Sequence, residues 1–595
     1  MRQIYLIIFL CIYVLYSFNI LGANKSKLPS FIIAKTGNLP LDKILAAHQR
    51  ELDENAKITT SFNQMALWET EGKSFLLKLL WSLGYYSATI DIKHPEKSDR
   101  PTIIFQITPA KQYTIRRISI ELLEPTAKQA AKLHLPPLTW LTLTADMPVV
   151  AAQVLAEQKR LYDFIENNNC LLNLEVNHQV TIDHILHVVD LAFTIKASST
   201  AAYISKLSFD GLQKVNAEYM HKIISVKEHS CFRRSIVNDY RVAIQKSGLF
   251  TMVEPVVTPV VGSDAAVNIT FKVKERAHRT VKAGTSYSTD LGVGINAGWE
   301  HRNFFGQGEK VNSMLSLTKV EKKLDTQFEK PFFLIDNQTL KINTLLEQQN
   351  NKAYTSQGVS LAVLLERKIS SHWTAGTGGK YGFSRIKEEA KKDFALFSIP
   401  THLAYDTRDN ILDPKSGIVV KGEASPFIDT ISFNNKFLKT AIIGSGYLPI
   451  KTVLEPVLAL RAVVGSTFGI ATPKMPATER FYTGGASSIR GYGYKLAGPL
   501  NQKNDPIGGR SMIETSAELR LRLNKDFGLV AFIDSGNVFD LAYPKFGGKL
   551  YVGTGLGLRY YTGFGPLRLD VAMPLNKRRK IDSAFHLYFS IGQAF

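Results

Sequence analysis

The chain has 595 residues and a mass of 66.4 kDa, and at roughly 150 residues per domain it is too long for one globular domain. Lysine and arginine number 72 against 52 acidic residues, a formal charge of +20, which favours a partner of negative charge such as nucleic acid or an anionic lipid surface. The mean hydropathy of −0.05 excludes a polytopic helical membrane protein, and three cysteines are too few for a disulfide scaffold.

The amino-terminal segment, residues 1–23, has the pattern of a secretory signal peptide. Arg2 precedes the uncharged apolar run 4–16, and Gly22 and Ala23 precede a polar stretch, so we expect cleavage after Ala23. An uncleaved anchor is the alternative, although the run is shorter than the ~20 residues that span a bilayer. No apolar run of about 18 residues follows, so a mature chain that enters a membrane must do so as a closed β-barrel.

Residues 24–276 carry a pattern that recurs about every 80 residues: a strand, two helical stretches and two strands. The strand that closes each repeat is rich in β-branched and aromatic residues, at 102–107, 188–195 and 267–273. The second helix of each repeat ends at a residue that tolerates the left-handed conformation, Gly84, Asn169 or Gly248. The sequence therefore predicts three α+β repeats of order βααββ, with boundaries 24–110, 111–199 and 200–276.

Two cysteines, Cys170 and Cys231, follow the signal segment and would meet an oxidising compartment. They fall in different predicted repeats, so the sequence favours two separate thiols over a disulfide, and Cys170 is interpreted as a small apolar core residue. Neither belongs to a CxxC motif or a His/Cys cluster, and we expect no metal site and no cofactor.

From residue 277 to residue 595 the pattern changes to strands of alternating polarity with glycine, aromatic residues and short turns. At about 20 residues per strand and loop, this length allows about sixteen strands, an even number as in bacterial outer-membrane barrels. In 512–523 and 567–573 charged residues alternate with aliphatic ones, which is typical of a polar lumen and a lipid-facing wall. The last segment places aromatic residues on one face: Phe585, Phe589 and Phe595. A soluble sandwich also alternates, but it would not need so many strands.

One motif is more specific, Gly484-Gly485-Ala486-Ser487-Ser488-Ile489-Arg490-Gly491-Tyr492. It resembles the R-G-[FY] loop of the outer-membrane assembly and translocation factors, which combine periplasmic POTRA domains with a sixteen-stranded transmembrane barrel. The resemblance implies that the loop folds into the lumen and that Arg490 pairs with Glu518 and Asp534 on the barrel wall. An always-charged guanidinium with a rigid fork of donors suits that role, and a solvated loop arginine is the alternative.

Within this superfamily, three repeats and the segment Ser286–Asp290 look most like the TamA branch, the translocation and assembly module subunit. That resemblance implies a non-enzymatic insertase whose barrel opens between its first strand, about 280–290, and its last, about 585–595. Gly592 would weaken the closing strand. The implied partners are a TamB-like periplasm-spanning protein, unfolded autotransporter and outer-membrane protein clients, and outer-membrane lipid. The basic cluster 577–580 is expected to contact lipopolysaccharide, with plain solubility as the alternative.

Three other functions stay open at this point. A general assembly factor like BamA shares the barrel, and a passive pore or a dedicated two-partner secretion transporter would also use one. The chain has no G-x-S-x-G, HExxH or phosphate-loop motif, so an enzyme is disfavoured, and we expect no nucleic-acid partner.

Overall fold

The computed structural model describes residues 30–58, 65–95, 102–123, 133–197, 202–224, 229–260, 266–388, 390–450, 452, 456–562 and 565–591. The predicted signal peptide, Gly592 and Phe595 lie outside the described residues. The described chain forms two compact units: one from parts of 1–207, 227–238 and 257–269, the other from parts of 208–226, 239–256 and 270–595.

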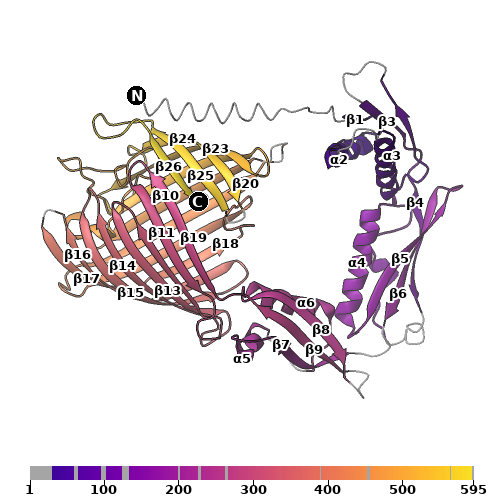
Figure 1. The fold of residues 1–595 in the computed structure, drawn as a ribbon, viewed down its shortest axis with the longest axis horizontal. Helices are drawn as coiled ribbons and strands as arrows, with labels where there is room; N and C mark the ends of the chain where they lie inside the picture. The colour runs from indigo at the N-terminus through magenta and orange to yellow at the C-terminus, as the bar shows by residue number, and fades with distance from the viewer. Residues whose placement is uncertain are drawn as a thin grey trace. The chain divides into compact units, whose positions relative to one another are not determined.

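Three small sheets of three strands each occupy the amino-terminal part of the chain, and in each the closing strand is central (Figure 1). The first repeat contains β1 (Ser30–Ile33), α2 (Leu39–Ile58), α3 (Met65–Ser82), β2 (Thr89–Lys93) and β3 (Thr102–Thr108). The second contains β4 (Thr114–Leu122), η2 (Leu138–Trp140), α4 (Ala151–Asn168), β5 (Leu174–Asp183) and β6 (Val188–Ala197). The third contains β7 (Tyr203–Asp210), α5 (Ala217–Ile223), α6 (Arg234–Lys246), β8 (Phe250–Pro259) and β9 (Ala266–Glu275).

The predicted α+β order is confirmed, with one α-helix among the described residues of the second repeat. In the first two repeats the opening strand runs parallel to the central strand, and the remaining strand runs antiparallel. Alternate residues of each central strand are buried, such as Ile103 and Phe105 in β3, because one face of the sheet packs against the helices.

Two of the three predicted helix ends have the expected conformation. Gly84 and Gly248 follow α3 and α6 with φ of +83° and +73°. The prediction for Asn169 is wrong, since its φ is −138°. The Asn169 side chain instead satisfies the end of α4 directly, with Nδ2 donating to the carbonyl oxygens of Ile165 (2.8 Å) and His134 (3.1 Å).

The two cysteines form a disulfide, so the prediction of separate thiols is wrong. Cys170 follows α4, Cys231 precedes α6, and their Cα atoms lie 5.1 Å apart. Two backbone hydrogen bonds explain the approach, because Ala202 donates to the carbonyl of Cys170 (2.6 Å) and accepts from the amide of Phe232 (2.8 Å). Position in different repeats did not argue against pairing, since the end of α4 in one repeat lies beside the start of α6 in the next.

The rest of the chain is a closed antiparallel barrel. Its strands are β10 (Arg279–Ser288), β11 (Gly292–His301), β12 (Lys310–Leu317), β13 (Glu321–Lys330), β14 (Gln338–Asn350), β15 (Thr355–Lys368), β16 (Trp373–Lys387), β17 (Lys391–Ser398), β18 (Thr401–Asp406), β19 (Gly417–Asp429), β20 (Lys436–Pro449), β21 (Val457–Phe468), β22 (Ser511–Arg522), β23 (Phe527–Phe539), β24 (Tyr551–Thr562), β25 (Gly565–Pro574) and β26 (His586–Ile591).

The barrel has sixteen strand positions, as predicted, because β17 and β18 share one. Both pair with β16 and both pair with β19, so they are two halves of one interrupted strand. The interruption falls at Ile399 and Pro400, where proline has no N–H to give to the ladder.

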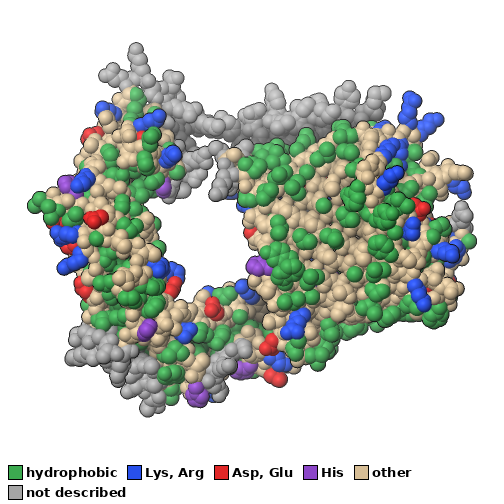
Figure 2. All heavy atoms as spheres, turned by 180° about the vertical axis from the view of Figure 1, so that it is seen from behind, with side chains coloured by type: hydrophobic (Ala, Val, Ile, Leu, Met, Phe, Trp, Pro, Cys, Tyr) green, Lys and Arg blue, Asp and Glu red, His purple; other side chains and the backbone are tan. Residues whose placement is uncertain are grey.

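The alternation predicted for the wall is also confirmed. In β22 the side chains of Glu514, Ser516 and Glu518 are buried while Leu519 is exposed, and β25 shows the same alternation. Apolar side chains cover much of the outer wall, and lysine and arginine side chains gather toward its rims (Figure 2). Separately, no helix among the described residues has the length and apolar character needed to cross a membrane.

Candidate functional site: the lumen loop and the seam

A long segment between β21 and β22, residues 469–510, folds into the barrel and is called the lumen loop below. Its centre is buried, with Ile489, Tyr492 and Ala497 packed in one apolar cluster with Tyr551 of β24. Gly491 turns the chain at φ +94°, and a Cβ there would lie 2.7 Å from the carbonyl carbon of Met573. Glycine is therefore required beside Arg490 both for its backbone conformation and for the space that it leaves.

Arg490 is held by carboxylates on the barrel wall. Its Nε and Nη2 donate to the two carboxylate oxygens of Asp534, at 2.7 and 2.9 Å, as a fork. Its Nη1 lies 2.8 Å from Oε1 of Glu518, and its guanidinium lies 3.5 Å from the ring centre of Phe532. The arginine side chain is 2% exposed, so these pairs are shielded from water and from salt. The structure thus brings together the three charged residues that the family motif implied.

The sequence reasoning missed a third carboxylate. Asp570 of β25 lies 3.2 Å from Nη1 of Arg490 and also contacts Arg559 and Arg568, while Glu518 contacts Arg520 at 2.8 Å. The available signal was the alternation of 567–573, which already placed Asp570 on the inward face. These side chains lie nearly or fully buried, so each charge depends on its partners for stability.

The two residues after Arg490 contact the last described strand. The amide of Gly491 donates to Oη of Tyr588 (3.2 Å), and that hydroxyl donates to the carbonyl of Tyr492 (3.5 Å). Tyr492 itself donates from Oη to Asn576 and to the carbonyl of Val552 (3.3 Å). The lumen loop is therefore bound to β26 by hydrogen bonds as well as to the acidic residues of β22, β23 and β25.

The barrel closes between β10 and β26, an edge called the seam below (Figure 1). Among the described residues, two Cα pairs join these strands: Tyr287 with Phe589, and Ser288 with Tyr588. By comparison, β10 and β11 share ten pairs. Thr289 adds a backbone hydrogen bond to the carbonyl of Leu587 (3.1 Å) and a side-chain contact to His586 Nδ1 (2.9 Å). The described seam is therefore the shortest strand pairing around the barrel.

Of the residues expected at the closing strand, Phe589 lies in the seam and is 37% exposed. Phe585 lies one residue before β26 and is exposed. Gly592 and Phe595 lie outside the described residues, so their predicted role in the seam stays a prediction.

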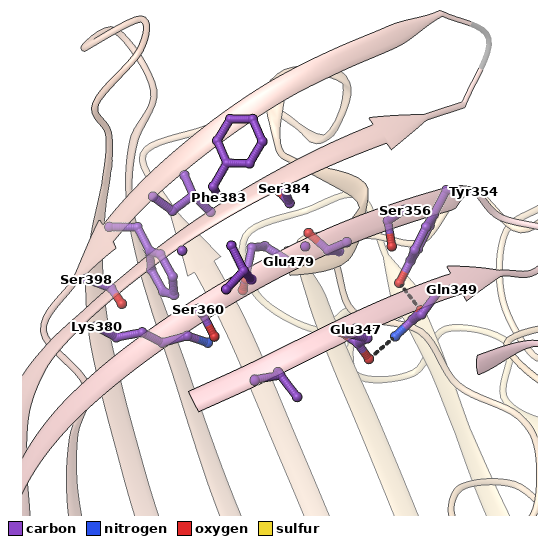
Figure 3. Close-up of a pocket in the computed structure, with 17 residues that line it drawn as sticks. Glu347, Gln349, Tyr354, Ser356, Ser360, Lys380, Phe383, Ser384, Ser398 and Glu479 are labelled. Carbon is purple, nitrogen blue, oxygen red and sulfur yellow. Dashed lines mark hydrogen bonds between the residues drawn. The ribbon is translucent and has the colours of Figure 1, made fainter. Parts of the chain in front are cut away.

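A second anchor of the lumen loop was not foreseen. Lys495, at φ +63°, donates from Nζ to Oη of Tyr354 (2.7 Å) and to Oε1 of Gln349 (3.3 Å), and it lies within 5.2 Å of the rings of Tyr354, Tyr482 and Tyr494. Figure 3 shows Tyr354 and Gln349 pointing toward each other at one end of a polar cavity of about 260 Å³. Lys495 thereby ties the loop to the turn between β14 and β15.

A third anchor lies at the start of the loop. Arg480 donates from Nη1 and Nη2 to the two carboxylate oxygens of Glu388 (2.6 and 3.0 Å) and from Nε to the carbonyl of Met475 (3.1 Å). Its side chain is 4% exposed. The lumen loop is thus fixed to the wall at several separated positions.

A sixteen-position barrel with a re-entrant arginine loop, preceded by small α+β sheets, defines a class of outer-membrane protein. Residues 303–595 match the Omp85 superfamily domain, and residues 202–276 match the surface antigen variable number repeat, the POTRA domain. The chain belongs to the Omp85 superfamily of outer-membrane barrels with amino-terminal POTRA domains. This superfamily, which includes BamA, is non-enzymatic.

Over the aligned residues, the chain is about a quarter identical to two curated relatives. It is 23% identical over 438 residues to the outer membrane protein assembly factor BamA of Nitratidesulfovibrio vulgaris, covering 71% of this chain and 55% of that protein. It is 25% identical over 370 residues to a SAM50-like protein of Schizosaccharomyces pombe, covering 56% and 76%. The chain therefore spans little more than half the length of this BamA.

A solved structure supports the same fold. The crystal structure of BamA from Haemophilus ducreyi lacking POTRA domains 1–3 superposes with a TM-score of 0.64 at 18% sequence identity, covering 80% of this chain and 99% of that one. At this identity the likeness shows the fold, and the function is argued from the site.

Proposed function

We propose that this protein inserts client β-barrel proteins into the outer membrane, and that the seam between β10 and β26 opens laterally to receive them. The observation that carries the proposal is the short pairing at the seam, two Cα pairs among the described residues against ten between β10 and β11. The names of the BamA relatives support assembly as the activity.

The physical reason is the cost of unpaired backbone groups in lipid. Each N–H or C=O group without a partner in the hydrocarbon region costs several kcal/mol, so an open seam strongly favours pairing with another strand. An unfolded client supplies such a strand, and it would extend from β10 or β26 by strand addition. Longer pairings elsewhere keep the remaining wall closed while this edge exchanges partners.

A disulfide across the seam tests the proposal. Tyr287 and Phe589 are paired and both exposed, and the Cα separation of paired residues in antiparallel strands suits a disulfide. We expect the Y287C/F589C variant to support client assembly only when reduced, because oxidation would hold the seam closed. The measurement is the yield of folded client barrel in outer-membrane vesicles with and without reductant.

The matched control keeps the cysteine at position 287 and places the second cysteine on β11, the other neighbour of β10. Tyr287 also pairs with Val293 of β11, so Y287C/V293C forms a disulfide within the wall and leaves the seam free. Its client assembly should be insensitive to oxidation. Equal client assembly by the oxidised seam variant and the oxidised control would overturn lateral opening.

A narrower candidate is a role like that of TamA, in which autotransporters are the main clients and a TamB-like periplasm-spanning protein is the partner. The observation in its favour is the arm of three α+β sheets in the described chain. The relatives reported above carry the names BamA and SAM50-like, which favours general barrel assembly as the first candidate. Contact with outer-membrane lipid, including lipopolysaccharide, belongs to either candidate.

A further inference from the structure

Arg578 lies in the loop between β25 and β26, within the basic cluster 577–580 that was expected to face lipopolysaccharide. Lys577, Arg579 and Lys580 are exposed, but the Arg578 side chain is 15% exposed and turns into the barrel. Its Nε and Nη2 donate to the two carboxylate oxygens of Asp582, at 2.9 and 2.8 Å. The charge of this member of the cluster is therefore paired with a carboxylate of the same loop, while contact of the cluster with lipopolysaccharide stays a prediction.

The remaining donors of Arg578 bind the lumen loop and β24. Nη2 donates to the carbonyl of Leu496 (2.6 Å), and Nη1 donates to the carbonyl of Gly498 (3.3 Å) and to Oη of Tyr551 (3.3 Å). All five N–H groups of the guanidinium therefore have an acceptor. Two of those acceptors are backbone carbonyls, which remain whatever side chains the loop carries.

The same short segment also holds the seam. Eight residues after Arg578, His586 contacts Thr289 of the chain just after β10, and Tyr588 pairs with Ser288. Tyr588 in turn accepts the hydrogen bond from the amide of Gly491. The segment 578–588 is thus hydrogen-bonded to the lumen loop at both of its ends, and its second end forms the weakly paired edge of the barrel.

We infer that Arg578 is a positioning residue that couples the lumen loop to the closing strand, so that the seam opens when the loop leaves its inner position. This inference rests on the proposed lateral opening and names the contact that restrains it. Only arginine fits, because a lysine supplies one point charge where Asp582 and two carbonyls need a planar fork. Among the described residues the pairing at the seam is short, so contacts from the loop add materially to what holds β26 in place.

Two cysteine reporters measure the coupling in the full-length protein. The rate of disulfide formation in Y287C/F589C reports seam closure, and maleimide labelling of A497C reports loop displacement, since Ala497 is fully buried. We expect R578A to slow cross-linking at the seam roughly tenfold and to speed labelling at position 497 roughly tenfold. A change of this size is what the loss of a charge-assisted hydrogen bond produces in an equilibrium. R578K should lie between R578A and the parent, and R579A, at the exposed neighbour, should match the parent.

A further variant separates the coupling from simple damage. R578A leaves the buried Asp582 carboxylate without its partner, which by itself destabilises the loop. R578A/D582N removes that unpaired charge and still lacks the bonds to Leu496 and Gly498. If the double variant returns both reporters to parental rates, the coupling is overturned. If R578A fails to give a folded barrel by semi-native electrophoresis, R578K and the double variant carry the same comparison.

The outcomes distinguish this inference from the proposed function. Suppose that R578A changes the cross-linking and labelling rates, but the oxidised seam variant still assembles clients. The coupling would then stand, and lateral opening would be rejected as the mechanism. Suppose instead that R578A and R578K leave both rates unchanged, and oxidation of the seam variant blocks client assembly. The coupling would then be rejected, and lateral opening would stand.

Discussion

Arg490 shows how a charged side chain can be buried in a membrane barrel. Three carboxylates, from Glu518, Asp534 and Asp570, surround a guanidinium that is 2% exposed. In such a site the pairing keeps the charges satisfied, and the loss of one partner leaves the others uncompensated. The arrangement therefore fixes the position of the lumen loop more than it adds to total stability.

We predict that R490A displaces the lumen loop and impairs client assembly while the barrel itself folds. Breaking a buried pair costs about 3–5 kcal/mol, and R490K should lose less because it keeps the charge. The measurements are the temperature at which the barrel loses its folded electrophoretic form and the yield of client barrel. The exposed Lys503 of the same loop gives the control K503A, and unchanged client assembly in R490A would contradict a role for this contact.

Glu275 holds the end of β9 against the segment that leads into α5. Its Oε1 accepts hydrogen bonds from the amides of residues 213, 214 and 215, at 2.8, 3.0 and 2.9 Å. Burial acts to raise the pKa of the Glu275 carboxyl, but the amides and a bond from His278 outweigh it, so the pKa is lowered. The same segment meets the barrel, because Asn303 Nδ2 donates to the carbonyl of Lys214 (3.0 Å).

This lowered pKa predicts an acid-sensitive contact. A carboxyl whose pKa is lower in the folded state than in the unfolded state stabilises the fold. The contribution is fully present at pH values above the unfolded pKa, about 4.3 for glutamate, and it is lost as pH falls through the folded pKa. We expect the amides of 213–215 to lose hydrogen-exchange protection progressively as pH is lowered from 7 to well below 4, after correction for intrinsic rates. E275Q should lack this pH dependence, and the exposed Glu218 gives the control E218Q.

At the scale of elements, the second and third repeats are joined by more than the chain between them. The disulfide from Cys170 to Cys231 is supported by Glu166, whose carboxylate accepts from the amide of Ser235 (3.2 Å) in the first turn of α6. A carboxylate at a helix amino terminus is favoured by the unsatisfied amides and by the helix dipole. These contacts make the end of α4 and the start of α6 one joint.

We expect the double variant C170S/C231S to loosen this joint. The disulfide links residues 61 apart, and a closed loop of that length restrains the unfolded chain by roughly 4 kcal/mol. The measurement is hydrogen exchange at Ser235 and at residues 202–204. The control variant is K206A, which changes another residue of β7 and keeps the disulfide. Equal protection in the serine variant and the parent would show that the disulfide adds nothing to the joint.

At the scale of the whole molecule, the range of clients separates the two candidate functions. A general assembly factor inserts most outer-membrane barrels, whereas a TamA-like protein serves a subset. We predict that depletion lowers the abundance of most barrels in the outer-membrane proteome and arrests growth. Selective loss of autotransporters in viable cells would favour the TamA-like function, and loss of one secreted protein with all barrels intact would indicate a dedicated transporter.

The sequence by itself determined the features that depend on local pattern. Alternation in 512–523 and 567–573 identified the inward and outward faces of strands, because side chains alternate with a period of two in any strand. The repeat order and the Arg490 motif were readable for the same reason, since both are runs of adjacent residues. Family resemblance then supplied Glu518 and Asp534, which alternation alone could place inward but could not pair.

Only the tertiary structure decided which distant groups meet. Asp570 and Arg578 contact the lumen loop, and Lys495 of that loop contacts Tyr354, each across 80 or more residues of sequence. The register of each strand in a closed barrel sets those contacts. Cys170 and Cys231 pair because consecutive repeats abut, which no spacing rule encodes. The seam, too, follows from closure of the barrel, because a strand's own sequence does not state how many residues its neighbour will pair with.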